Sequence, residues 1–114
     1  MQTSPVFKAY DVRGTYPDQL NEELARAVGS AFAAFVASPR ILVARDMRPS
    51  GVPLVAAFAD GARAVGVEVV DLGLASTDLL YFAAGHLDAP GAMFTASHNP
   101  AAYNGIKLCL AGAA

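Results

Sequence analysis

The chain has 114 residues and a net charge of −2, and 16% of its residues are charged while 54% are hydrophobic. This length suits one domain of ordinary size, no basic run suggests nucleic-acid binding, and no apolar run approaches the ~20 residues of a membrane-spanning helix. Because residues 1–5 lack the pattern of a secretory signal and the single cysteine, Cys109, cannot form an intrachain disulfide, we expect a cytoplasmic protein.

The first part of the chain predicts an extended segment followed by a helix. Apolar side chains in residues 6–12 indicate either a short edge strand or an extended arm, which Gly14 and Pro17 end. Apolar residues then recur at helical spacing over residues 18–37. Asp18 or Asn21 is expected to cap this helix, because both side chains can accept a hydrogen bond from its first free amides.

The remaining elements follow from apolar runs and the turn residues between them. The continuous apolar run at residues 40–45 predicts a strand buried on both faces, as in a parallel sheet. Ser50 can cap the helix after it, and Ser76 or Thr77 can cap the third helix. The later elements are expected in this order: helix 52–65, strand 67–72, helix 77–85, strand 92–95 and strand 104–110. The last strand should return antiparallel beside the strand before it.

The alternation of helices and strands predicts an α/β fold with right-handed crossovers, as a three-layer α/β/α sandwich. Its sheet is expected to be mixed and four-stranded, with the last strand antiparallel. Ligands bind such sheets at the carboxyl ends of the strands. Three loops should therefore gather at one edge of the sheet, namely residues 46–51, 73–77 and 96–103.

A reactive-looking loop follows the strand at residues 92–95. It carries Ser97 and His98 and is followed by a turn at Asn104-Gly105. Serine is a poor nucleophile unless a base or a positive environment assists it, and Lys107 can approach if the last two strands pair. The loop contains no carboxylate to orient the histidine, and the pattern G-x-S-x-G is missing, so acyl transfer is disfavoured.

Phosphoryl transfer suits this loop better than acyl transfer. It requires mainly positioning and cations around the crowded phosphate oxygens. The chain offers four such cations: Arg13, Arg45, Arg48 and Lys107.

The candidate residues, and three others of notable type, also have purely structural interpretations. Local chemistry alone is compatible with Ser97 forming a turn, His98 donating a hydrogen bond in the loop, and Lys107 being a solvated charge at a strand edge. It is equally compatible with Tyr10 lying in the core, Arg45 pairing with Asp46, Cys109 being buried and inert, and His86 only stabilising a helix C-terminus.

Three stretches together resemble the α-D-phosphohexomutase superfamily. They are residues 7–14 (FKAYDVRG), residues 44–51 (ARDMRPSG), and residues 95–100 (TASHNP) with residues 104–107 (NGIK). The first stretch is similar to the phosphomannomutase/phosphoglucomutase branch of that superfamily. The resemblance extends over nearly the whole chain, in order and in spacing.

The resemblance implies that residues 1–114 are domain I of a four-domain protein, shortened at its C-terminal end and without domains II–IV. Members are isomerases of carbohydrate metabolism that interconvert hexose 1-phosphate and hexose 6-phosphate. They act through a phosphoserine and a hexose 1,6-bisphosphate intermediate. The resemblance also implies that the domain alone is inactive.

The resemblance assigns roles to matching residues. Ser97 would carry the phosphoryl group, and its phosphate would be one ligand of a Mg²⁺ ion whose other ligands lie in the second domain. By the same resemblance, His98 would assist proton transfer or orient the phosphate, and Lys107 would bind the phosphate. Arg13 would contact the reacting group, and Tyr10 would line the substrate cleft. Arg45 and Asn99 would support the serine loop.

Two alternatives remain open at this point. A non-catalytic sugar-phosphate-binding α/β module would favour a glycine-rich phosphate loop, but residues 44–51 lack G-x-G-x-x-G. A serine hydrolase would use Ser97 and His98. For a mutase, the expected partners are a phosphorylated hexose and the remaining domains. Because charged residues are scarce, apolar interdomain faces are expected to cause self-association; neither nucleic acid nor membrane is an expected partner.

Overall fold

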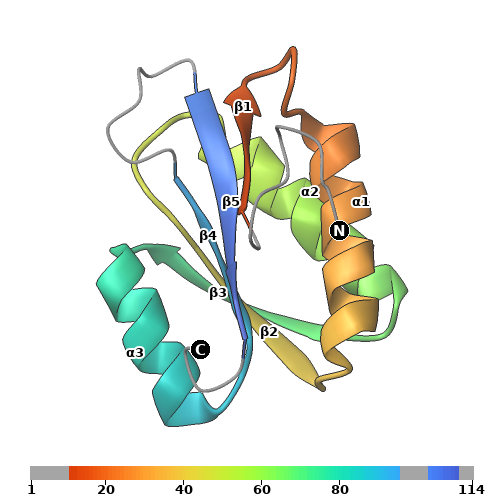
Figure 1. Cartoon of the computed structure of the whole chain (residues 1–114), viewed down its shortest axis with the longest axis vertical. Coiled ribbons are helices and arrows are strands. Elements are labelled where there is room, and N and C mark those ends of the chain that lie inside the picture. The colour runs from red at the N-terminus through yellow and green to blue at the C-terminus, as the bar shows by residue number, and fades with distance from the viewer. Residues whose placement is uncertain (1–10, 96–102, 111–114) are drawn as a thin grey trace.

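The computed structural model describes residues 11–95 and 103–110, which form an open mixed sheet with helices on both faces (Figure 1). In chain order the elements are β1 (Asp11–Thr15), α1 (Glu22–Val36), β2 (Arg40–Arg45), α2 (Gly51–Ala64), β3 (Glu68–Leu74), α3 (Thr77–Leu87), β4 (Gly91–Phe94) and β5 (Tyr103–Cys109). The strand order is β1-β5-β4-β2-β3. Strand β2 is parallel to β3 and β4, whereas β5 is antiparallel to β4 and β1.

The predicted class, a three-layer α/β/α sandwich with a mixed sheet and an antiparallel last strand, is confirmed, but the sheet has five strands instead of four. The additional strand is β1, the edge strand that the sequence offered as an alternative to an extended arm, and it continues through Gly14 to Thr15. Gly14 lies opposite Asn104 on β5. A Cβ atom on Gly14 would lie 2.7 Å from Cβ of Gln19, so glycine allows the turn after β1 to fold back against the strand.

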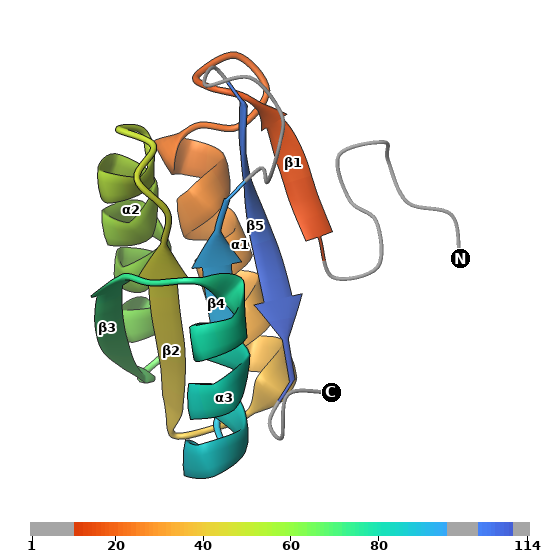
Figure 2. The ribbon, with the colours of Figure 1, turned by 90° about the vertical axis from the view of Figure 1, so that its left-hand side faces the viewer.

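The two faces of the sheet carry separate apolar clusters, as strands buried on both sides require. On β2, Ile41 and Val43 pack with the residues of α1 and α2, whereas Leu42 and Ala44 pack with those of α3. Figure 2 shows α1 and α2 on one side of the sheet and α3 on the other. Residues 41–44 therefore all pack in the core, because alternate residues of the strand face opposite helical layers.

The helix caps match the sequence prediction at two of three positions. Asn21 caps α1, since its Oδ1 accepts a hydrogen bond from the Leu24 amide at 2.9 Å. Ser76 caps α3 in the same way through the Leu79 amide at 3.0 Å. Ser50 occupies the cap position of α2 but makes no capping hydrogen bond, so the third prediction was wrong.

Helices α1 and α2 cross at two buried glycines. A Cβ atom on Gly29 would overlap the backbone carbonyl of Phe58, and one on Gly61 would overlap the carbonyl of Arg26. This close approach brings the Phe58 ring onto Phe94 of β4, with the ring centroids 5.4 Å apart in a T-shaped arrangement. The glycines therefore set how deeply α2 is seated on the sheet.

Gly61→Ala is expected to lower the free energy of unfolding by about 1–3 kcal/mol, because the added methyl group meets the backbone of α1. Gly85→Ala is the matched control in α3, where a Cβ atom would meet nothing within 4 Å. The control should raise stability by up to about 1 kcal/mol through helix propensity. Urea denaturation measures both, and equal effects of the two substitutions would contradict the close-crossing interpretation.

Candidate functional site

The carboxyl ends of the parallel strands meet at one edge of the sheet, as predicted. The Asp46 amide donates to the carbonyl oxygen of Phe94 at 3.1 Å, which joins the ends of β2 and β4. The Ala75 amide donates to the carbonyl oxygen of Arg45 at 3.1 Å, which joins the ends of β2 and β3. The 46–51 and 73–77 loops therefore lie together with the end of β4 at the edge where ligands bind such sheets, whereas residues 96–102 of the third predicted loop lie outside the described residues.

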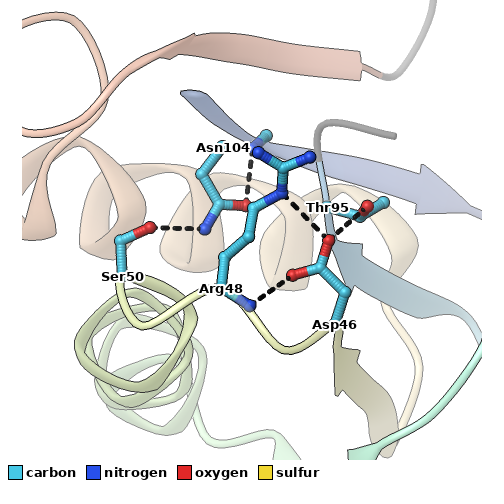
Figure 3. A network of polar contacts seen from close by, with 6 residues as sticks. Asp46, Arg48, Ser50, Thr95 and Asn104 are labelled. Atoms are coloured by element: carbon cyan, nitrogen blue, oxygen red, sulfur yellow. Dashed lines mark hydrogen bonds and ion pairs between the residues drawn. The ribbon is translucent and has the colours of Figure 1, made fainter. Parts of the chain in front are cut away.

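The loop after β2 is organised around the carboxylate of Asp46 (Figure 3). Its Oδ1 accepts a hydrogen bond from the Arg48 amide at 3.0 Å, and its Oδ2 accepts one from Arg48 Nε at 3.2 Å. Only 12% of the Arg48 side chain and 24% of the Asp46 side chain are exposed, so water screens this pair less than a surface pair. Asp46 thus forms its ion pair with Arg48, where the sequence suggested Arg45.

Thr95, the first residue after β4, is bonded to this loop. Its hydroxyl donates to Asp46 Oδ2 at 2.6 Å, a short, charge-assisted hydrogen bond. Its amide donates to the Gly105 carbonyl at 3.0 Å, across the β4–β5 pair. Thr95 therefore holds one flank of the 96–102 segment, which carries the predicted Ser97, His98 and Asn99.

Asn104 holds the other flank, near the start of β5. Its side chain is fully buried. The Asn104 Nδ2 group donates to Ser50 Oγ at 2.7 Å, and its Oδ1 accepts from the Gly105 amide at 2.8 Å (Figure 3). A buried amide is costly unless it is hydrogen-bonded, so these two contacts fix its position. The Ser50 hydroxyl, which the sequence predicted would cap α2, instead accepts the hydrogen bond from Asn104.

Four of the predicted site residues, Ser97, His98, Asn99 and Tyr10, lie outside the described residues. Arg13 and Lys107 lie on the paired strands β1 and β5, where Arg13 is opposite Gly105 and Lys107 is opposite Asp11.

Lys107 also faces Met93 across the β4–β5 pair, so the two final strands do pair as the sequence reasoning required. It is partly exposed. Among the described residues, no ion pair involves its ammonium group.

Arg45 ends β2, but its side chain lines a different surface. It lies in a groove of about 320 Å³ between α2 and strands β2 and β3, together with Asp71 and Arg63. The side chain that contacts Thr95 belongs instead to the next residue, Asp46. The sequence reasoning did not single out the roles of Asp46, Thr95 and Asn104, although the prediction that loops 46–51 and 96–103 share one edge contained the needed signal.

Among residues 11–95 and 103–110, no group of three or more His, Cys, Asp or Glu side chains is arranged to hold a metal ion. No helix there has both the length and the apolarity needed to cross a bilayer.

Cys109 is buried in the cluster beneath α3, as predicted. Burial raises the pKa of its thiol above the usual range, and a backbone hydrogen bond with Gly91 offsets part of that effect. Because the thiolate is the reactive form, a raised pKa together with burial indicates a structural residue and not a nucleophile.

Alkylation of Cys109 by iodoacetamide at pH 8 is therefore expected to be at least ~10-fold slower in the folded protein than in urea. Mass spectrometry over time measures both rates. Similar rates would show that the thiol is accessible and ionised in the folded state.

The fold and the edge described above define an α/β/α domain whose candidate chemistry lies where the 46–51 loop meets the end of β4. Residues 4–114 match the family model described as phosphoglucomutase/phosphomannomutase, alpha/beta/alpha domain I. The chain belongs to this family.

Several relatives resemble the chain closely. A protein named "Phosphohexose mutases" from Xanthomonas campestris pv. campestris is 50% identical over 107 residues, which are 93% of this chain and 24% of the relative. The phosphomannomutase of Escherichia coli K12 is 41% identical over 114 residues, 99% of this chain and 25% of the relative. The chain thus spans about a quarter of the length of each of these two relatives.

A solved structure has the same fold. The crystal structure of a phosphoglucomutase/phosphomannomutase family protein from Burkholderia thailandensis superposes with a TM-score of 0.86 at 43% identity. The match covers 94% of this chain and 26% of that protein.

Proposed function

We propose that this chain is the phosphoserine-bearing domain of a phosphohexomutase that interconverts hexose 1-phosphate and hexose 6-phosphate. The observation that supports the proposal is how the two flanks of the serine motif are held. Thr95 and Asn104, which flank the segment containing Ser97, are both hydrogen-bonded to the 46–51 loop at the carboxyl edge of the sheet. Family membership and the names of the relatives support the same reaction.

The proposed reaction has two phosphoryl transfers. In the first, the Oγ–P bond of phospho-Ser97 breaks, a P–O bond forms to a free hydroxyl of the sugar phosphate, and the hydroxyl proton passes to the released Ser97 Oγ. In the second, the resulting hexose bisphosphate presents its other phosphate to Ser97: the bond between that phosphorus and its sugar oxygen breaks, a new Oγ–P bond restores the phosphoserine, and the Ser97 proton passes to the released sugar oxygen. The net change moves the phosphate between positions 1 and 6 of the hexose.

The other predicted residues are assigned around this transfer. Lys107 would bind the phosphoserine oxygens, and Arg13 on the neighbouring strand would contact the reacting group. His98 would assist proton transfer or orient the phosphate, Tyr10 would line the substrate cleft, and Arg45 and Asn99 would support the loop. Two cations from paired strands suit a reaction whose catalysis depends on positioning and charge.

A Mg²⁺ ion would supply further charge neutralisation for such a transfer. The described residues do not by themselves make a site for it, because Asp46, the carboxylate at this edge, already accepts hydrogen bonds from Arg48 and Thr95. We therefore assign only the phosphate of Ser97 to the ion and propose that its other ligands come from another domain.

The proposed parent protein is a cytoplasmic enzyme of four domains, of which this chain is the first. Its partners would be a phosphorylated hexose and the other domains, and the chain alone is expected to be inactive. Apolar side chains exposed on and beside α3, including Leu74, Leu79 and Phe82, support contact with those domains or self-association of the isolated chain.

Intact-protein mass spectrometry of the full-length protein tests the proposed function. We expect one phosphoryl group that maps to Ser97, and Ser97→Ala should remove both this group and the conversion of glucose 1-phosphate to glucose 6-phosphate. Ser38→Ala, in the short connection between α1 and β2, is the matched control and should leave both unchanged. Labelling of Ser97 by a fluorophosphonate, without phosphorylation, would favour a serine hydrolase instead.

A further inference from the structure

We propose that Asp46 and Ser50 are positioning residues for phosphoryl transfer, because they bind the two flanks of the segment that carries Ser97. The inference rests on the proposed function above. The roles proposed above include neither Asp46 nor Ser50, and neither residue is assigned a contact with the substrate or with the transferred phosphoryl group. Asp46 acts through Thr95, and Ser50 acts through Asn104.

The first anchor joins Asp46 to Thr95, residues 49 positions apart in the sequence. Three hydrogen bonds converge on the Asp46 carboxylate, two from Arg48 and one from the Thr95 hydroxyl. Arg48 thus orients the carboxylate to which Thr95 binds. A shielded, charge-assisted bond of 2.6 Å restrains the threonine more strongly than a neutral bond would.

The second anchor joins Ser50 to Asn104, residues 54 positions apart. Ser50 is held by the start of α2, since its carbonyl accepts from the Leu54 amide at 3.2 Å. Asn104 is fully buried, and both ends of its amide are hydrogen-bonded. Moving this flank would therefore leave a buried amide unsatisfied, which is costly.

The two anchors belong to one short loop between the end of β2 at Arg45 and the start of α2 at Gly51. The amide of Gly51 donates to the Arg48 carbonyl at 2.9 Å, which closes this loop on itself. The two flanks are also joined to each other by the bond from the Thr95 amide to Gly105. The loop therefore acts as a common base for both ends of the 96–102 segment.

This arrangement favours positioning over direct chemistry for Asp46. Both carboxylate oxygens already accept hydrogen bonds, so service as a metal ligand or general base would first break the contacts to Arg48 or Thr95. Transfer of a phosphoryl group depends on the alignment of its donor and acceptor oxygens, and a misplacement near 1 Å costs ~100-fold in rate. Loss of an anchor should thus slow turnover without removing substrate contacts.

The test uses the full-length protein, with variants at each anchor and a control. Thr95→Val removes the hydroxyl at nearly constant shape, whereas Thr95→Ser retains it. Ser50→Ala removes the acceptor for Asn104, and Asp46→Asn removes the charge that binds Thr95. Asp60→Asn, an exposed position on α2, is the control for the loss of a carboxylate.

We expect Thr95→Val, Asp46→Asn and Ser50→Ala to lower kcat by ~10–100-fold while KM changes by less than ~3-fold. Thr95→Ser and Asp60→Asn should remain within ~3-fold of wild type in both constants. Hydrogen exchange measured by mass spectrometry should rise ~10-fold in peptides that contain Thr95 or Gly105, with no change in peptides from β2.

The inference is overturned if the three variants keep wild-type kcat and wild-type exchange at the flanks while only their melting temperatures fall. It is also overturned if KM rises and kcat does not, because the residues would then act in substrate binding. If the wild-type protein shows no mutase turnover, the proposed function fails. The exchange data then still decide whether the anchors hold the flanks.

Discussion

The hydrogen bond from the buried Asn104 amide to the Ser50 hydroxyl constrains the candidate site most strongly. Asn104 is the one fully buried polar residue among those whose side chains the structure describes. Its position at the start of β5 therefore cannot shift without breaking a contact that burial makes costly to lose. The bond between Thr95 and Asp46 gives the end of β4 a similar restraint, and both bonds end on the same loop.

The fold supports this loop from both sides. Strand β2 is buried on both faces, and α2 is seated against α1 at Gly29 and Gly61, so the loop connects two elements with little freedom to move. The ring contact between Phe58 of α2 and Phe94 of β4 links the seating of α2 to the strand that leads into the serine motif. Core packing and site geometry are therefore coupled, and a change at the helix crossing should be transmitted to Ser50 and Asn104.

Much of this architecture could be predicted from local patterns. The apolar run of β2, the helical spacing of α1 and the cap at Asn21 each depend on residues close in sequence, and the structure confirms them. The fifth strand was left out of the predicted sheet because the apolar residues at 6–12 suit an edge strand as well as an extended arm, and only the pairing of β1 with β5, distant in the sequence, decides between them. The role of Ser50 was mistaken because its partner lies 54 residues away, and no local pattern reveals such a contact. The pairing of the last two strands was predicted correctly, while the roles of Ser97 and His98 remain predictions.

A double-mutant cycle on kcat tests the central claim most directly, namely that Asp46 acts on turnover through Thr95. The cycle compares Asp46→Asn, Thr95→Val and the double variant in the full-length protein. If the two residues act as one anchor, the double variant should lose no more activity than the more impaired single variant. Losses that multiply would show that Asp46 and Thr95 contribute independently, and would contradict the account.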